Sequence, residues 1–210
     1  MKKIVEMVPD GACLFRSLAC GLLYSYTGHV LKGSEFGIEE TLGDCCLNVV
    51  ARWLRCLVVY AMLLDDRVYT VDTLMHEEHS FRSLLYFLGA LLEEKGPMYV
   101  FPTQRSKRAF LRHLSLPMLS KTCPMETTIM GIPWAFVLEE PLVPYARRMW
   151  KNTTWGGEVE LILLHRILQL PIEVCKTKYK LLTVYGDACK RDAVRLQVRF
   201  KKDHYDAIIG

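Results

Sequence analysis

The stretch Pro9-Asp10-Gly11-Ala12-Cys13-Leu14-Phe15-Arg16 places a cysteine at the start of an apolar run. Leucines recur every fourth residue beyond it, which predicts a helix over residues 13–24 with an apolar face. The proline and the glycine favour a turn just before this helix. Cys13 would therefore lie in the first helical turn, where unpaired backbone N–H groups and the helix dipole favour a thiolate.

A second informative stretch, Asp203-His204-Tyr205-Asp206, lies near the end of the sequence. Apolar and polar residues alternate over 194–201, which predicts a strand with one exposed face, then a turn at 201–203 and a last strand over 205–209. On a strand, His204 and Asp206 would point to the same side, so that the carboxylate could orient the imidazole. Asp10, which is close to the cysteine in sequence, is the alternative acid.

A thiol, an imidazole and an acid are the parts of an activated cysteine nucleophile. Each has an ordinary structural explanation when taken alone, because Cys13 is one of eight cysteines and His204 is one of six histidines. If the fold brings these two residues together, the chain is a hydrolase. The turn before Cys13 could then also direct backbone N–H groups at the oxyanion of a tetrahedral intermediate, and Gly11 permits the backbone conformation that such a turn needs.

Composition argues against several classes of protein. The 27 basic and 23 acidic residues give a net charge of +4, and they are scattered, so we expect no nucleic-acid partner. The most apolar segment, 47–64, carries Arg52 and Arg55, so we expect no membrane span. The N-terminus lacks an apolar signal segment, and the cysteines form no CxxC pair. Reduced thiols in a cytoplasmic protein are therefore expected.

A metal site is also not expected. His76 and His79 are spaced for one face of a helix, but no third or fourth ligand accompanies them. A solvated helix face explains this pair better than a ligand pair does. We therefore expect neither a metal nor a cofactor.

The order of predicted elements indicates the fold class. A second helix is expected from about 38–44 to 64, a third helical region over 71–90, and a buried helix over 158–168. Short strands are expected over 172–175 and 181–185. Seven prolines between 96 and 144 favour loops and short elements there. Helices come mainly first and strands mainly last, which predicts one α+β domain over 1–210 with a small sheet.

The segment Trp155-Gly156-Gly157 precedes the buried helix. Two adjacent glycines more often serve close packing, and we favour that interpretation here. The alternative is that the bare backbone lets an extended substrate peptide approach, which would make these three residues part of a groove for the substrate tail.

Together, these segments resemble the ovarian-tumour (OTU) family of cysteine proteases. Residues 10–17 (DGACLFRS) are similar to the family's D-G-N-C-L-F-R-S nucleophile motif, residues 155–161 (WGGEVEL) to its W-G-G-x-x-E-L motif, and residues 204–206 (HYD) to its terminal H-Y-D/N motif. Three motifs in the family's order are far more specific than any one of them. The divergent middle, about 28–145, matches no motif of the family and suggests a virus- or pathogen-encoded member.

The resemblance implies a papain-like α+β fold with a small, mostly antiparallel sheet packed between helices. It also implies a monomeric deubiquitinase that cleaves the bond after the C-terminal glycine of ubiquitin, polyubiquitin or a ubiquitin-like modifier, in the host cytoplasm if the protein is viral. Cys13 would be the nucleophile, His204 the general base and acid, and Asp206 or Asp10 the orienting acid. The backbone N–H groups of residues 10–13 (Asp10, Gly11, Ala12 and Cys13) would form the oxyanion hole.

One departure from the family pattern keeps two alternatives open. Ala12 stands where the family usually has a polar residue, often Asn, so the loop loses a side chain that could brace it. A resting loop that the substrate must reorganise would follow. The alternatives are a catalytically weak ubiquitin-binding module and a thiol hydrolase that acts on a substrate other than ubiquitin.

Overall fold

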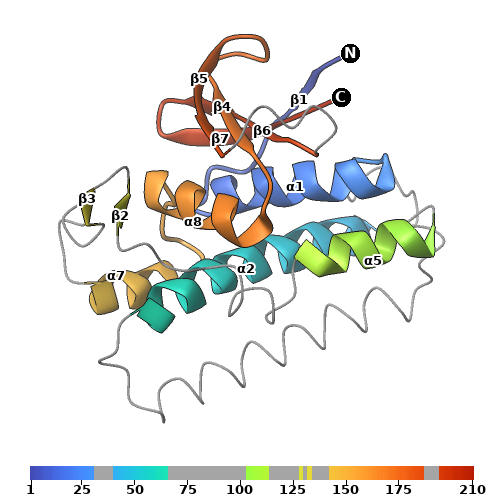
Figure 1. The fold of residues 1–210 in the computed structure, drawn as a ribbon. Coiled ribbons are helices and arrows are strands. Elements are labelled where there is room, and N and C mark those ends of the chain that lie inside the picture. The colour runs from blue at the N-terminus through green and yellow to red at the C-terminus, as the bar shows by residue number, and fades with distance from the viewer. Residues whose placement is uncertain (31–39, 66–102, 114–127, 130–131, 134–141, 187–193) are drawn as a thin grey trace.

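The computed structural model describes residues 1–30, 40–65, 103–113, 128–129, 132–133, 142–186 and 194–210 (Figure 1). Helices in this part of the chain are α1 (Cys13–Thr27), α2 (Glu40–Asp65), α5 (Gln104–His113), α7 (Leu142–Met149) and α8 (Glu158–Leu168). Strands are β1 (Lys3–Val5), β2 (Thr128–Ile129), β3 (Ile132–Pro133), β4 (Ile172–Cys175), β5 (Leu181–Tyr185), β6 (Leu196–Lys201) and β7 (His204–Ile209). The protein therefore has the predicted α+β class.

Several elements predicted from periodicity are confirmed. Helix α8 and strands β4 and β5 have the predicted bounds, and α1 runs three residues further than expected, to Thr27. Helix α2 spans the predicted region, and it buries an apolar face that includes Val49, Trp53, Cys56 and Leu57. The helical region predicted over 71–90 lies outside the described residues.

Other elements were not predicted. Helix α5 lies in the region expected to hold loops and short elements, although β2 and β3 do fit that expectation. The sequence of α5, QRSKRAFLRH, is mostly polar, and its fully buried Phe110 does not by itself make a periodic pattern. Strand β1 has three residues, too few for an alternation to be recognised.

The main sheet joins the two ends of the described chain. Its strand order is β1-β7-β6-β4-β5, in which β4 and β6 run parallel and the other neighbours run antiparallel. Figure 1 shows the described helices on one side of this sheet, with α1 and α8 next to it. The expected small, mostly antiparallel sheet is therefore confirmed, and the described helices pack against it.

Helix α1 forms the centre of the core. It packs on β6 and β7 on one side and on α2 on the other (Figure 1). Its leucines at 14, 18 and 22 are fully buried, and Gly21 faces β6, where an added Cβ would lie in ordinary van der Waals contact with Leu196, 3.5 Å from its Cδ2. This burial on both sides fixes where the N-terminal end of α1, and so Cys13, lies relative to the sheet.

A tight hairpin turn joins β6 to β7 at the predicted place. Lys201 and His204 are paired across it, and the two residues between them, Lys202 and Asp203, have φ values of 50° and 59°. Left-handed conformations at both turn positions match the right-handed twist of a hairpin, and they favour Asn and Gly. The turn therefore places His204 at the start of β7 at a local conformational cost.

Replacing Asp203 by glycine should relieve this cost, because glycine adopts positive φ without strain. We expect Asp203→Gly to raise the free energy of unfolding by about 1 kcal/mol, measured by urea denaturation. Asp203→Ala is the matched control, since it removes the same side chain and keeps a Cβ. A stabilisation of equal size by alanine would contradict this explanation.

Candidate active site

Cys13 is the first residue of α1 and is buried, with 1% of its surface exposed. Burial raises the pKa of its thiol, and the Asp10 carboxylate adds to this effect. Backbone hydrogen bonds from Tyr205 and Leu14 oppose it and lower the pKa, but the net direction is upward. The thiol therefore needs a neighbouring base to become a nucleophile, despite its place at a helix N-terminus.

The two ring nitrogens of His204 differ in their hydrogen bonding. Its Nε2 lies 3.0 Å from Asp206 Oδ1, whereas its Nδ1 is buried and has no hydrogen-bond partner among the described residues. A neutral imidazole that donates from Nε2 keeps a lone pair on Nδ1, which makes that atom the base. The backbone of the next residue, Tyr205, lowers the pKa of Cys13, and α1 packs against β7, so the start of α1 and the start of β7 lie close to each other.

The two candidate acids have different partners. Asp206 is 2% exposed, and its Oδ1 also accepts a hydrogen bond of 3.0 Å from the Met7 N–H group. Asp10 instead accepts hydrogen bonds from the Arg16 side chain and the Ala12 N–H group. The geometry thus places Asp206, and not Asp10, against the imidazole.

Burial by itself would raise the pKa of Asp206. The Met7 N–H group, Arg199 and the neighbouring His204 outweigh burial and hold the pKa of this carboxyl below its usual value. Asp206 is therefore an ionised hydrogen-bond acceptor at neutral pH, as an orienting acid must be.

Two backbone N–H groups of the loop before Cys13 donate hydrogen bonds within the loop itself. The Asp10 N–H group donates to Val8 O at 3.0 Å, and the Ala12 N–H group donates to Asp10 Oδ1 at 3.2 Å. Of the four N–H groups expected at an oxyanion hole, those of Gly11 and Cys13 have no acceptor within the described part of the chain. The resting loop therefore offers fewer donors than the sequence resemblance implies.

A buried arginine from α2 holds this loop in place. The guanidinium of Arg55, 1% exposed, donates to the backbone oxygens of Gly11 (3.0 Å), Met149 (2.9 Å) and Thr154 (2.9 Å). It also lies over the Phe15 ring, 4.2 Å from its centroid. Burial, followed by the nearby Arg52 charge, lowers the pKa of Arg55 to about 10. The only sequence signal for this residue was a charge inside an apolar run.

Gly11 is packed too closely for any side chain. Its φ is +82°, and an added Cβ would lie 2.3 Å from Thr153 O. The loop before Cys13 and the loop after α7 are therefore in direct contact, and Arg55 donates hydrogen bonds to both.

Structural roles account for much of the Trp155-Gly156-Gly157 segment, as the favoured interpretation predicts. A Cβ at Gly156 would lie 2.8 Å from Leu14 Cδ2, so this glycine lets α1 pack closely. The Gly157 N–H group donates to Glu160 Oε2 at 2.6 Å, which closes the N-terminus of α8. Trp155 is 49% exposed, so it is the one side chain of the three that is available to a ligand.

Glu160 is a buried carboxyl that the site does not use directly. Its Oε1 accepts a hydrogen bond of 2.7 Å from the Tyr145 hydroxyl, which joins α8 to α7. Burial raises its pKa. This capping role explains why a Glu stands three residues after Gly157.

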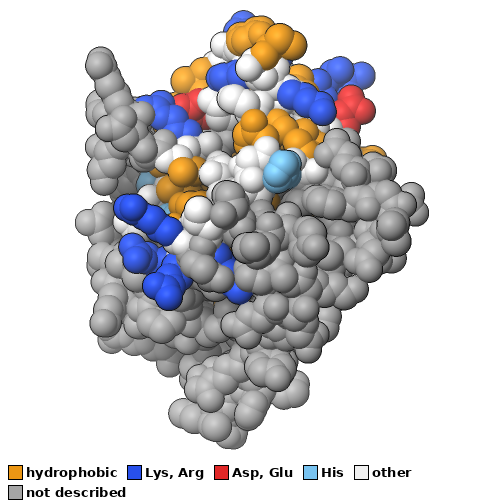
Figure 2. Space-filling view, turned by 90° about the vertical axis from the view of Figure 1, so that its right-hand side faces the viewer, with side chains coloured by type: hydrophobic (Ala, Val, Ile, Leu, Met, Phe, Trp, Pro, Cys, Tyr) orange, Lys and Arg blue, Asp and Glu red, His pale blue; other side chains and the backbone are white. Residues whose placement is uncertain are grey.

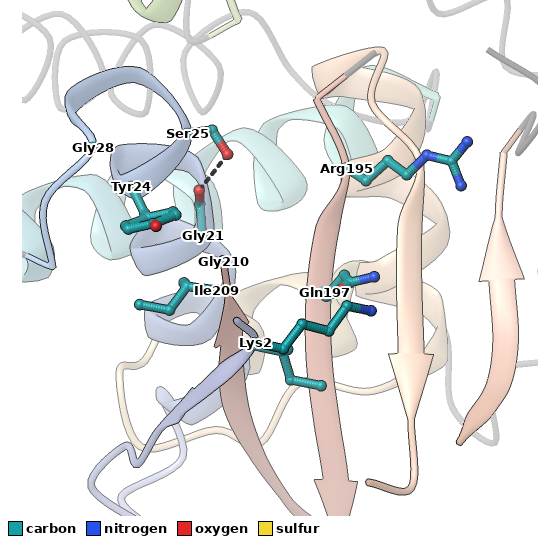
Figure 3. Close-up of a pocket in the computed structure, with 10 residues that line it drawn as sticks. Lys2, Gly21, Tyr24, Ser25, Gly28, Arg195, Gln197, Ile209 and Gly210 are labelled. Atoms are coloured by element: carbon teal, nitrogen blue, oxygen red, sulfur yellow. Dashed lines mark hydrogen bonds between the residues drawn. The ribbon is translucent and has the colours of Figure 1, made fainter. Parts of the chain in front are cut away.

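The pocket in Figure 3 lies away from these residues. It is lined from α1 by Gly21, Tyr24 and Ser25, from β6 by Gln197, and by Arg195 just before β6. These α1 residues belong to the C-terminal half of the helix, whereas Cys13 begins it. The pocket is therefore separate from the candidate active site.

No three His, Cys, Asp or Glu side chains among the described residues lie close enough together to hold a metal ion. His76 and His79 lie outside the described residues. None of the helices described here is long and apolar enough to cross a membrane. On the face in Figure 2, the described Lys and Arg side chains lie in separate groups among apolar and uncharged ones. Cys13, Cys20, Cys56 and Cys175 are buried, and none of these four is in a disulfide.

No protein-family model and no curated protein matches the sequence. Among solved structures, the fold is similar to the OTU domain of OTUD1, with 14% identity, a TM-score of 0.45, and coverage of 100% of this chain and 86% of that chain. It is also similar to the viral OTU domain protease from Farallon virus, with 17% identity, a TM-score of 0.39, and coverage of 99% and 83%. A third similar structure contains OTUB1 with ubiquitin aldehyde and UBC13~Ub, with 11% identity, a TM-score of 0.47, and coverage of 98% and 77%.

The Arg55 contacts predict a large stability effect. Arg55→Met should lower the free energy of unfolding by about 3 kcal/mol, because it leaves buried carbonyl groups of two loops without donors. Arg52→Met is the matched control one helical turn away. Arg52 is half-buried and donates to Trp150 O and Asn152 Oδ1, so its loss should cost about 1 kcal/mol or less. Equal losses in urea denaturation would contradict the assigned role of Arg55.

Proposed function

We propose that this chain is an OTU-type cysteine deubiquitinase. It would hydrolyse the bond between the C-terminal glycine of ubiquitin, or of a ubiquitin-like modifier, and a substrate amine. The observation that carries the proposal is the state of the His204 ring: Asp206 holds its Nε2, and its buried Nδ1 has no partner among the described residues, on a strand that packs against the helix that Cys13 begins. The three OTU-like motifs over residues 10–206 support the choice of substrate.

The first half of the proposed reaction forms a thioester. Cys13 transfers its thiol proton to His204 Nδ1, and the thiolate attacks the carbonyl carbon of the modifier's terminal glycine. The oxyanion that forms accepts hydrogen bonds from the N–H groups of Gly11 and Cys13. Collapse of this intermediate breaks the C–N bond, and His204 protonates the departing amine.

The second half releases the modifier. A water molecule gives a proton to His204 and attacks the thioester carbonyl carbon, and the Cys13 thiolate leaves. The products are the free modifier carboxylate and the regenerated Cys13–His204 pair. Asp206 keeps the imidazole in one tautomer and stabilises its protonated form through both halves. No cofactor takes part in these steps.

The enzyme proposal predicts a covalent adduct. Ubiquitin with a C-terminal electrophile should form a thioether with the wild-type protein at Cys13, detected by intact mass and peptide mapping. Cys13→Ala should form none. Cys20→Ala is the matched control, because it removes another buried thiol of the same helix, and it should react like the wild type.

The other outcomes separate the alternatives. Binding of ubiquitin by the wild type without an adduct would indicate a catalytically weak binding module. Neither binding nor an adduct would indicate a thiol hydrolase with another substrate. An adduct at a different cysteine would contradict the assignment of Cys13.

The two acids should differ sharply in their effect on rate. Asp206→Asn should lower kcat by about 100-fold or more, because the amide can present a donor to the imidazole and change its tautomer. Asp10→Asn should change kcat by about threefold or less, since Asp10 pairs with Arg16 at a partly exposed site. Hydrolysis of a fluorogenic ubiquitin substrate measures both. Losses of similar size would mean that the roles of the acids are wrongly assigned.

A further inference from the structure

We propose that Arg199, which belongs to none of the three motifs, is a positioning residue that holds the Asp206 carboxylate in the orientation that His204 requires. The inference rests on the proposed function, since it assigns a role around the same imidazole. Arg199 lies on β6 directly opposite Asp206 on β7.

The two oxygens of Asp206 have separate partners. Arg199 Nε donates to Oδ2 at 3.0 Å, and Arg199 Nη2 donates to the same oxygen. Oδ1 accepts from the Met7 N–H group and lies 3.0 Å from His204 Nε2. Because a guanidinium fork occupies Oδ2, rotation of the carboxylate would break contacts with Arg199, and Oδ1 stays directed at the imidazole.

The burial of Asp206 makes these contacts necessary. Its side chain is 3% exposed, whereas that of Arg199 is 20% exposed. Without Arg199, two of the donors that compensate the buried charge are lost, and water has little access to replace them. The carboxylate would then rotate, or take up a proton at a higher pH than in the intact site.

The charged groups around Asp206 come from β7, from β6 and from the segment just after β1. His204 lies on its own strand β7, and Arg199 lies on the neighbouring β6. Glu6, just beyond β1, has Oε1 4.0 Å from Arg199 Nη2, but its side chain is 82% exposed and therefore screened by solvent. Arg199 is thus the one cation within hydrogen-bond distance of Asp206 in the described residues, apart from His204 when it is protonated.

A purely structural role for Arg199 is the competing explanation. An arginine that only bridges two strands would contribute to stability, and its removal would leave the pH dependence of the site unchanged. A positioning role changes the ionisation of Asp206. Since Arg199 helps to lower the pKa of Asp206, its removal raises that pKa, and the acid limb of Cys13 reactivity should move to higher pH.

Arg195 is the matched control. It lies just before β6 and pairs with the carboxylate of Glu173 on β4 at 3.1 Å. Figure 3 shows Arg195 at the pocket described above, which is separate from the candidate active site. Arg195→Gln therefore removes an arginine–carboxylate pair beside the same sheet that involves Glu173 and not Asp206.

The test measures the alkylation rate of Cys13 by iodoacetamide from about pH 4 to 8, with the site of modification confirmed by peptide mapping. We expect Arg199→Gln to lower the rate at pH 6 by about tenfold and to move the acid limb to higher pH. Arg199→Lys should recover part of the rate, because it restores the charge without the fork. Arg195→Gln should follow the wild-type profile.

Three results would overturn the proposal: an unchanged acid limb in Arg199→Gln, equal effects of Arg199→Gln and Arg195→Gln, or a lysine variant no better than glutamine. Circular dichroism at each pH shows whether a variant is folded, and if Arg199→Gln does not fold, the comparison of Arg199→Lys with the wild type decides. Alkylation needs no ubiquitin. If the wild type does not hydrolyse ubiquitin but shows the expected profiles, the proposed function fails while the role of Arg199 stands.

Discussion

A buried guanidinium with carbonyl partners is the constraint on which the candidate site depends. Arg55 is removed from water, and it donates to backbone oxygens of the loop before α1 and of the loop after α7. A buried charge without such acceptors would be strongly unfavourable, so both loops must stay in place for the protein to fold. The position of Cys13 is therefore determined as much by α2 as by the turn that precedes it.

The helices and strands that were predicted are those whose burial repeats regularly along the sequence. Helix α8 is apolar on most faces, and β6 alternates between a buried and a wetter face, so both can be read from the sequence. Helix α5 and strand β1 have no such pattern. They are stabilised by residues distant in sequence, as in the pairing of Lys3 with Ile209, and local periodicity contains no information about such contacts.

The candidate site was predictable only where a residue's neighbours in the sequence indicate its role. Cys13 and His204 could be proposed from their neighbours, because each stands at the start of a recognisable element. The sequence did not distinguish Asp206 from Asp10 as the orienting acid. The hydrogen-bond partners of the two carboxylates, His204 for Asp206 and Arg16 for Asp10, distinguish them. Arg199 could not be recognised at all, because in the sequence it is one of four polar residues on the wet face of an alternating strand, and only the register of β6 with β7 places it on Asp206.

The order of these parts along the chain has a consequence for synthesis. Cys13 begins α1, whereas His204 and Asp206 belong to β7, a strand that is synthesised later and must insert between β1 and β6. A nascent chain that lacks this strand holds the thiol without its base or its acid. In the proposed enzyme, cleavage of modifiers is thus withheld until β7 has been synthesised, and a chain truncated before β7 would carry an unactivated cysteine.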